Sequence, residues 1–392
     1  MMTKLLLYGY CRGVRSSRRL ERATQEDVGT RILCADNAPD FRTIAAFRAR
    51  HLEALDGLFL QVLKLCRESG LAKLGHVAID GTKIRANASK HRAMSYARME
   101  EEEARLRSEV RQMLEDAARI DAEEDALYGA DKRGDELPPE LARRESRLKK
   151  ISEAKAALEA QAKEAACEGK AKTDRPGPKA QRNFTDPDSR IMLSSDKAFI
   201  QAYNAQAAVD GDSQVIVAAE VIQAANDKGQ LVPMVEAVID NLDEIPDVVS
   251  ADAGYWVEAD VKGIEEYEIE PLVAPKKIRH REWREAELFN TPMPEGLSTR
   301  EQMEWKLRTE RGRREYGKRK ISVEPVFGQM KEAQGFRRFL LRGHRKVRSE
   351  WKLACTAHNV LKLFRSGAAA GLFGPGGSLS ASGAGVTLAP GV

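Results

Sequence analysis

The sequence of 392 residues is 42% hydrophobic, 6% aromatic and 32% charged, with a net charge of +4. This composition indicates a soluble, rather helical protein with two or three structural units. No apolar run approaches the length of a membrane span, and the five cysteines have no paired spacing, which argues against a membrane protein, a zinc site and a disulfide framework. We therefore expect a cytoplasmic protein with no membrane partner.

Positive charge is concentrated in particular segments of the chain. Residues 300–352 contain seventeen Lys and Arg against seven Asp and Glu, and residues 1–50 contain ten basic against five acidic residues. Such segments suit a polyphosphate partner, whose binding weakens steeply with salt. For any one basic segment taken alone, a solvated surface is the favoured explanation.

Residues 1–72 are predicted to be helical, because apolar residues recur there at three- and four-residue spacing. Asp40 follows a proline and is a plausible helix start. The helical pattern already begins at Lys4 with no capping residue before it, so we expect that upstream sequence is missing. We interpret 1–72 as a shortened DNA-binding or oligomerisation region.

Residues 73–365 are predicted to form one α/β domain. Strand signals at HVAID, AFIQAYNAQAAVD and SQVIVAAEVI are followed by alternating helix and strand signals, which favours a mixed sheet with helices on both faces. Residues 90–170 interrupt this domain with two narrow apolar stripes at coiled-coil spacing. Each stripe needs another helix to cover it, so a helical-hairpin insertion is predicted. This insertion either dimerises or braces DNA, or it merely packs on itself.

Two further segments are predicted to lack regular structure. Residues 172–189 (KTDRPGPKAQRNFTDPDS) form a linker rich in helix and strand breakers. Residues 366–392 contain no charged residue and are mostly Gly, Ala and Ser, which indicates a disordered tail.

Three acidic residues stand in contexts that suit metal binding. Asp80 follows the apolar run HVAI and precedes Gly81, and Asp252 follows VVSA, so both are predicted to end strands. Glu324 is predicted in the first turn of a helix that Ser322 caps. Taken singly, each acid has an ordinary structural explanation as a turn residue or a helix-dipole partner. Together they provide the oxygen ligands that a pair of divalent cations requires, provided that they converge.

At these segments the chain resembles a bacterial insertion-sequence transposase of the DDE type, which has a ribonuclease-H-like catalytic core. HVAIDGTKIRANASKHRAMSY resembles the segment around the first catalytic aspartate of that family, and VVSADAGYW resembles the segment around the second. YGKRKISVEPVFGQMKEAQGFRRFLLRG resembles the third-acid segment, in which a lysine follows the glutamate seven residues later. The resemblance implies that Asp80, Asp252 and Glu324 are metal-binding catalytic acids, and that Lys331 contacts a phosphate of the transposon end.

The resemblance also implies further DNA contacts before the glutamate. The family pattern has a tyrosine and an arginine seven and four residues ahead of it, where this chain has Gly317 and Lys320. Tyr316 and Arg319 each lie one place away. Tyr316, Arg319 and Lys320 are therefore all candidate DNA-binding residues, and the alternatives stay open.

The function that the resemblance implies is metal-dependent cleavage and strand transfer of insertion-sequence DNA. Asp80 is the expected bridging ligand of two Mg²⁺ ions, with Mn²⁺ as a substitute, and Asp252 and Glu324 hold one ion each. The expected partners are the terminal repeats and the target DNA, with a homodimer in the synaptic complex. The sequence has no ATPase-type phosphate loop, so no ATP is expected. The alternatives are a related nuclease without strand transfer, or an inactive, truncated remnant that only binds DNA.

Overall fold

A computed structural model describes residues 1–128, 139–169, 173–194, 196–277, 287–289 and 291–367. Nearly all of the predicted tail at 366–392 lies outside the described residues, as does the turn of the predicted hairpin. None of the described helices is both long and apolar enough to cross a lipid bilayer.

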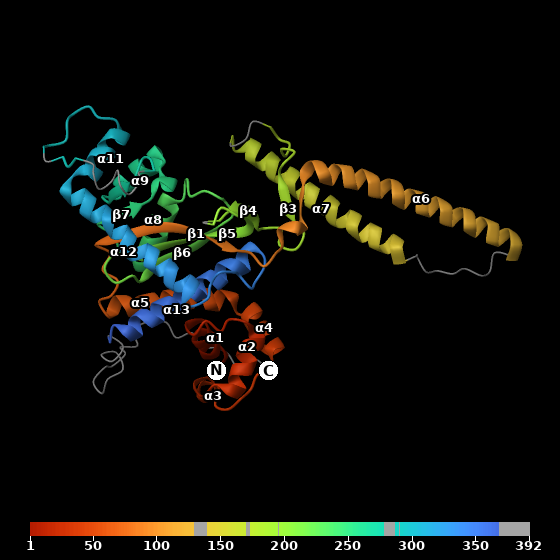
Figure 1. Cartoon of the computed structure of the whole chain (residues 1–392), viewed down its shortest axis with the longest axis horizontal. Helices are drawn as coiled ribbons and strands as arrows, with labels where there is room; N and C mark the ends of the chain where they lie inside the picture. The colour runs from red at the N-terminus through yellow and green to blue at the C-terminus, as the bar shows by residue number, and fades with distance from the viewer. Residues whose placement is uncertain (129–138, 170–172, 195, 278–286, 290, 368–392) are drawn as a thin grey trace.

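A mixed sheet forms the centre of the molecule (Figure 1). Its strand order is β4-β5-β1-β7-β8, and β6 pairs with β5 beyond the end of β4. β1 runs antiparallel to β5 and parallel to β7, which is in turn parallel to β8. The six strands of the described sheet are β1 (His76–Arg85), β4 (Arg190–Leu193), β5 (Phe199–Asp210), β6 (Ile216–Ile222), β7 (Val248–Ala251) and β8 (Glu270–Val273).

Helices flank this sheet, so the predicted α/β class with a mixed sheet between helices is confirmed. α13 and α8 pack on β6, and α12 crosses β1 and β5. The connections between β6, β7 and β8 each contain a helix, as parallel strands require. The helices that follow the N-terminal region and the hairpin are α8 (Leu231–Leu242), α9 (Glu258–Glu265), α11 (Thr299–Arg308), α12 (Glu310–Glu332) and α13 (His344–Arg365).

The N-terminal helices pack against the C-terminal part of the chain. α1 and α5 contact α13, and the guanidinium of Arg15 joins the two ends. Arg15 donates hydrogen bonds to the carbonyls of Gly335 (2.8 Å) and Arg338 (2.9 Å) and lies 3.5 Å from the carboxylate of Glu350. The helices are α1 (Met2–Cys11), α2 (Ser17–Glu26), α3 (Val28–Leu33), α4 (Phe41–Arg50), which Asp40 caps, and α5 (Leu52–Glu68).

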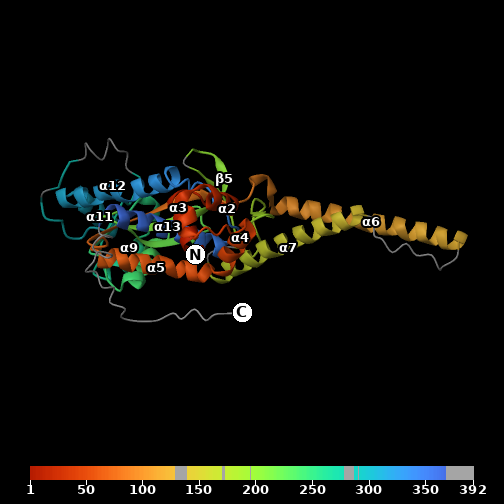
Figure 2. The ribbon, with the colours of Figure 1, turned by 90° about the horizontal axis from the view of Figure 1, so that it is seen from below.

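Two long helices, α6 (Tyr96–Tyr128) and α7 (Pro139–Cys167), lie side by side and project from the sheet (Figures 1 and 2). Leu106, Ile151 and Leu158 are buried between them, close to the sheet. A two-stranded ribbon of β2 (Ala93–Ser95) and β3 (Gln181–Asn183) joins this pair of helices to the rest of the protein. The prediction that 172–189 has no regular structure is wrong at β3, because Gln181–Asn183 pair with β2 and thereby close the base of the pair.

The predicted end of the first strand is also wrong. β1 continues through Asp80 to Arg85, because β5 pairs with it along its whole length after Ile79. Asp80-Gly81 therefore lies inside a strand and forms no turn. Gly81 is needed for a close approach: a Cβ there would lie 2.4 Å from the Gln206 amide nitrogen on β5.

The predicted start of the helix that carries Glu324 is wrong as well. α12 begins at Glu310 under a Thr309 cap, and Ser322 is a buried residue in its middle, with its hydroxyl on the carbonyl of Lys318. A proline inside a helix cannot donate to the carbonyl four residues before it. Before Pro325 this carbonyl is that of Ile321. It accepts a hydrogen bond from the side-chain amide of Gln214 at 2.7 Å, and the helix therefore continues through Pro325.

Candidate active site

Asp80 and Asp252 occupy equivalent positions beside each other at the end of a parallel ladder. The ladder between β1 and β7 ends with the pair Ile79 and Ala251; Asp80 comes next within β1, and Asp252 comes directly after the end of β7. Neighbouring strands lie about 4.8 Å apart, so this register brings two acidic residues to one place in the sheet. Asp252 also caps the short 3-10 helix η2 (Ala253–Tyr255), where one of its oxygens accepts the Gly254 N–H at 2.8 Å.

Burial dominates the electrostatics of Asp80. It raises the pKa of this carboxyl to about 7, opposed by Arg319 and assisted by the negative charges of Asp252 and Asp227. The Asp80 carboxylate accepts the backbone N–H of Gly81 at 2.8 Å and lies 3.2 Å from Nη1 of Arg319. A carboxyl with its pKa near neutrality, next to like charges, gains most from a nearby cation.

Arg319 is the cation at this position. It projects from α12, and its guanidinium carbon lies 5.7 Å from the centre of the Tyr316 ring. Burial lowers the pKa of Arg319, but Tyr316 and the acidic groups around it raise it overall, and those groups are Asp80, Asp252 and Glu324. The guanidinium therefore interacts electrostatically with all three of the acids that the sequence singled out.

Glu324 is exposed on α12, in the segment between two residues that reach β1. Arg319 reaches Asp80, and the Lys331 ammonium donates a hydrogen bond to the hydroxyl of Thr82. Asp80 and Thr82 are two residues apart on one strand and so face the same side of the sheet. Glu324 and Lys331 are seven residues apart, two turns along one face of the helix.

The other predicted DNA-binding residues differ in their surroundings. Tyr316 is partly buried beside Arg319, and burial raises its pKa. Lys320 is exposed on α12. Of the two candidates for the arginine position, it is Arg319 that contacts Asp80.

Sequence reasoning missed a fourth acidic residue at this site, Asp227, in the loop before α8. Its carboxylate accepts hydrogen bonds from the side-chain amides of Asn204 (2.7 Å) and Gln206 (2.8 Å) on β5. A Cβ on Gly81 would lie 2.5 Å from one oxygen of Asp227, and a Cβ on Gly254 would lie 3.3 Å from the other. Asp227 therefore lies against the backbone next to both Asp80 and Asp252.

A signal for this missed residue was present in β5. Asn204 and Gln206 alternate in the middle of β5, and both are completely buried. Buried amides need polar partners. Gln206 has a second polar partner in Tyr255, whose phenol donates a hydrogen bond to the Gln206 side-chain oxygen.

The donors at this site have the chemistry that hard divalent cations take, since they are all carboxylate oxygens. Their arrangement only partly fits a metal pair. Asp80, Asp227 and Asp252 interact electrostatically, whereas Glu324 is exposed and acts on Arg319. Among the residues that the structure describes, no group of three or more His, Cys, Asp and Glu side chains is arranged as a metal site.

Two family models match the chain, one at each end of the fold. Residues 290–364 match the model described as "Transposase DDE domain", and residues 1–50 match the one described as "Transposase domain (DUF772)". The first match contains Arg319, Glu324 and Lys331. Asp80 and Asp252 lie outside both matches. No curated protein and no solved structure gives a significant match.

Both matches are to transposase domains, and the structure packs the two matched segments together through Arg15. They confirm the resemblance to an insertion-sequence transposase of the DDE type. A transposase function follows from the two matches at this coarse level.

Proposed function

We propose that this protein cleaves the ends of an insertion sequence and joins them to target DNA, with divalent metal ions as cofactors. One observation carries the proposal. Asp80 and Asp252 come directly after the last residue pair of two adjacent parallel strands, and Arg319 of the matched transposase segment lies against Asp80. The mixed sheet, with antiparallel β6, β5 and β1 beside parallel β7 and β8, supports a ribonuclease-H-like core.

In this proposal Asp80, Asp252 and Glu324 would hold the metal ions, which would be Mg²⁺ with Mn²⁺ as a substitute. Bound ions of this kind make water a stronger nucleophile and stabilise charge on the attacking and leaving oxygens. Asp80 must be ionised for this task. With its pKa raised to about 7, it is only partly ionised at neutral pH, and a bound cation would favour the charged form. Asp227 holds the amides of Asn204 and Gln206 and so orders the β5 wall behind Asp80.

The basic residues of α12 have the complementary task of holding DNA. Lys331 is the proposed contact to a transposon-end phosphate. Its ammonium donates a hydrogen bond to Thr82, which lies two residues after Asp80 on β1. Arg319 is placed to bind a phosphate oxygen once its ion pair with Asp80 opens, because a guanidinium donates several hydrogen bonds from one plane. Tyr316 orients Arg319, and the exposed Lys320 adds to the positive field.

The experiment is a cleavage assay on supercoiled DNA that carries the terminal repeats of the element. We expect Mg²⁺-dependent nicking and joined products, and a loss of at least about 100-fold in Asp80→Asn, Asp252→Asn and Glu324→Gln, since each removes a ligand of a metal that stabilises the transition state. Glu332→Gln is the matched control, because Glu332 is an exposed acid of the same helix that pairs with Arg337. It should retain full activity.

The assay also separates the competing functions. Nicking without joined products would indicate a nuclease without strand transfer. DNA binding without Mg²⁺-dependent nicking would indicate a remnant that only binds DNA. Full activity in Asp80→Asn would refute the proposed site. The synaptic complex is expected to be a homodimer that assembles on DNA in the cytoplasm.

A further inference from the structure

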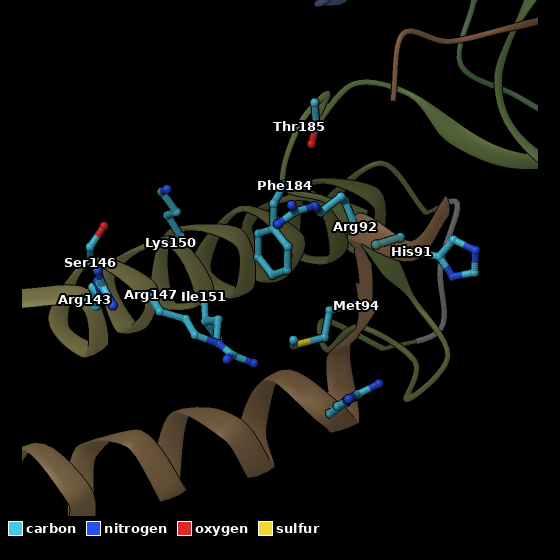
Figure 3. A pocket seen from close by; sticks show the side chains of 12 residues that line it. His91, Arg92, Met94, Arg143, Ser146, Arg147, Lys150, Ile151, Phe184 and Thr185 are labelled. Atoms are coloured by element: carbon cyan, nitrogen blue, oxygen red, sulfur yellow. The ribbon is translucent and has the colours of Figure 1, made fainter. Parts of the chain in front are cut away.

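A cavity of about 530 Å³ lies at the base of the α6–α7 pair. We call it the basal cleft; it is formed by residues 91–94, the beginning of α6, one face of α7 and the residues that follow β3 (Figure 3). No acidic residue lines it. Its cations are Arg92, Arg98, Arg143, Arg147 and Lys150.

Three cations of the basal cleft lack the acidic partners that several arginines elsewhere on α6 and α7 have. Outside the cleft, Arg107 pairs with Glu103 at 2.7 Å and Arg119 with Asp116 at 3.1 Å. Within the cleft, Arg147 is 3.6 Å from Glu102. In the part of the chain that the structure describes, the side chains of Arg92, Arg143 and Lys150 have no ion pair or hydrogen bond and are exposed.

The floor of the basal cleft is apolar and includes an aromatic ring. Phe184, half-buried, and Met94 pack on the small hydrophobic cluster that contains Ile151. Figure 3 shows the Phe184 ring between the side chains of Arg92 and Ile151. Unneutralised cations around an aromatic face are the combination that binds a nucleic-acid backbone and stacks an unpaired base. An acidic protein partner would gain nothing specific from that ring.

A line of exposed arginines connects the basal cleft with the candidate active site. The loop that leaves β1 contains Asn87, and it leads directly to Arg92. Arg338 and Arg342, both exposed, donate hydrogen bonds to the Asn87 side-chain oxygen (2.6 Å) and carbonyl (2.9 Å). Positive charge therefore lies over the loop that leads from β1, the strand of Asp80, to the cleft.

We propose that the basal cleft binds the phosphodiester backbone of an unpaired DNA segment, with a base stacked on Phe184. The proposal rests on the proposed function in one respect, because it takes DNA as the ligand of the whole molecule. It assigns to the base of the paired helices a DNA-binding site separate from the acids of the sheet.

The test is binding of a fluorescent single-stranded oligonucleotide and of a duplex to the full chain, in EDTA, over a salt series. The double variant R143A/K150A should lower affinity for the single strand about tenfold or more, and it should reduce the slope of log K against log salt by about 1.4, two phosphate contacts at about 0.7 each. Phe184→Leu keeps the apolar floor and should weaken the single strand more than the duplex. These residues are exposed or conservatively changed, and unchanged thermal unfolding verifies the fold.

The matched control is R107A/R119A, which removes the same charge from acid-paired positions on the neighbouring helix α6. It should bind as the wild type does. Equal losses in both double variants, or unchanged affinity and slope in R143A/K150A, would overturn the proposal. If the wild type binds DNA through the cleft yet never nicks it, the cleft stands and the proposed function fails. If the wild type nicks DNA and R143A/K150A keeps its affinity and slope, the proposed function stands and the proposal for the cleft fails.

Discussion

Nη1 of Arg319 lies 3.2 Å from Oδ2 of Asp80, and this contact ties the matched transposase segment directly to the first predicted catalytic acid. Both side chains are largely buried, with 12% and 19% of their surface exposed. The pair therefore works at lower dielectric than a surface ion pair. It supplies Asp80 with a positive charge from within the chain.

Arg319→Ala should weaken both the site and its DNA affinity. Removal of a partner from a largely buried ion pair leaves the other charge uncompensated, with a cost of about 3 kcal/mol in unfolding free energy. Lys320→Ala, at the adjacent exposed position, should cost less than about 0.5 kcal/mol. Chemical denaturation and DNA-binding titrations of the two variants measure the difference. Lys320 occupies the position at which the family pattern has its arginine. Equal effects of the two substitutions would mean that Lys320 contributes to the site as much as Arg319 does.

The stability of the protein should depend on pH through Asp80. Its pKa is raised to about 7 in the folded state, chiefly by burial, so the folded state binds this proton more tightly than the unfolded chain. Between pH 4 and 7 the contribution of Asp80 to stability therefore falls as pH rises, by up to about 1.4 kcal/mol per pH unit.

The measurement compares the wild type with Asp80→Asn, which cannot ionise, by denaturation in EDTA at several pH values. The variant should gain stability relative to the wild type as pH rises to 7 and stay constant above about pH 8. A difference that is independent of pH would contradict the raised pKa. Addition of Mg²⁺ should restore wild-type stability at neutral pH and have little effect on the variant.

Asp227→Asn tests the acid that sequence reasoning missed. An amide oxygen there can still accept from both Asn204 and Gln206, but these bonds lose their charged acceptor, and one negative charge beside Asp80 is removed. We expect cleavage to fall about 10- to 100-fold, as is typical when groups that orient metal ligands are changed. The pH at which cleavage reaches half its maximum should move down, because the pKa of Asp80 falls. A lower rate with an unmoved pH profile would indicate a purely structural role.

Arg15→Ala should destabilise the protein by about 3–5 kcal/mol, because Glu350 is left buried without its counterion. Arg22→Ala is the control: Arg22 pairs with Glu26 on the exposed face of α2, where such pairs contribute only about 0–1 kcal/mol. Thermal unfolding of both variants provides the comparison. Similar midpoints would show that Arg15 contributes no more than a surface residue.

Sequence patterns predicted a strand best where the segment was short and contained only small or apolar residues. VVSA before Asp252 has only one structural reading, a short buried strand, and β7 ends where the pattern does. Asp80-Gly81 looked like a turn because that dipeptide is common in turns. Pairing with β5 overrode this local preference, and the glycine serves the approach of Gln206.

The rest of the site depends on contacts that no local pattern contains. Pro325 suggested a helix start, whereas the side chain of Gln214, more than a hundred residues away, supports the helix through it. Asp227 stands in an ordinary loop before a helix, and only its contacts with β5 bring it to the site. The choice between Arg319 and Lys320 also required the direction in which each side chain leaves α12.

The contacts of Arg15 have a consequence for how copies of this gene decay. A deletion at the 5′ end would remove a side chain on which Glu350 and two backbone carbonyls near the other terminus depend. Such a copy would encode every acid of the sheet and still yield a polypeptide prone to unfold and be degraded. Under the proposed function, such a copy would lose activity although it keeps the codons of Asp80, Asp252 and Glu324.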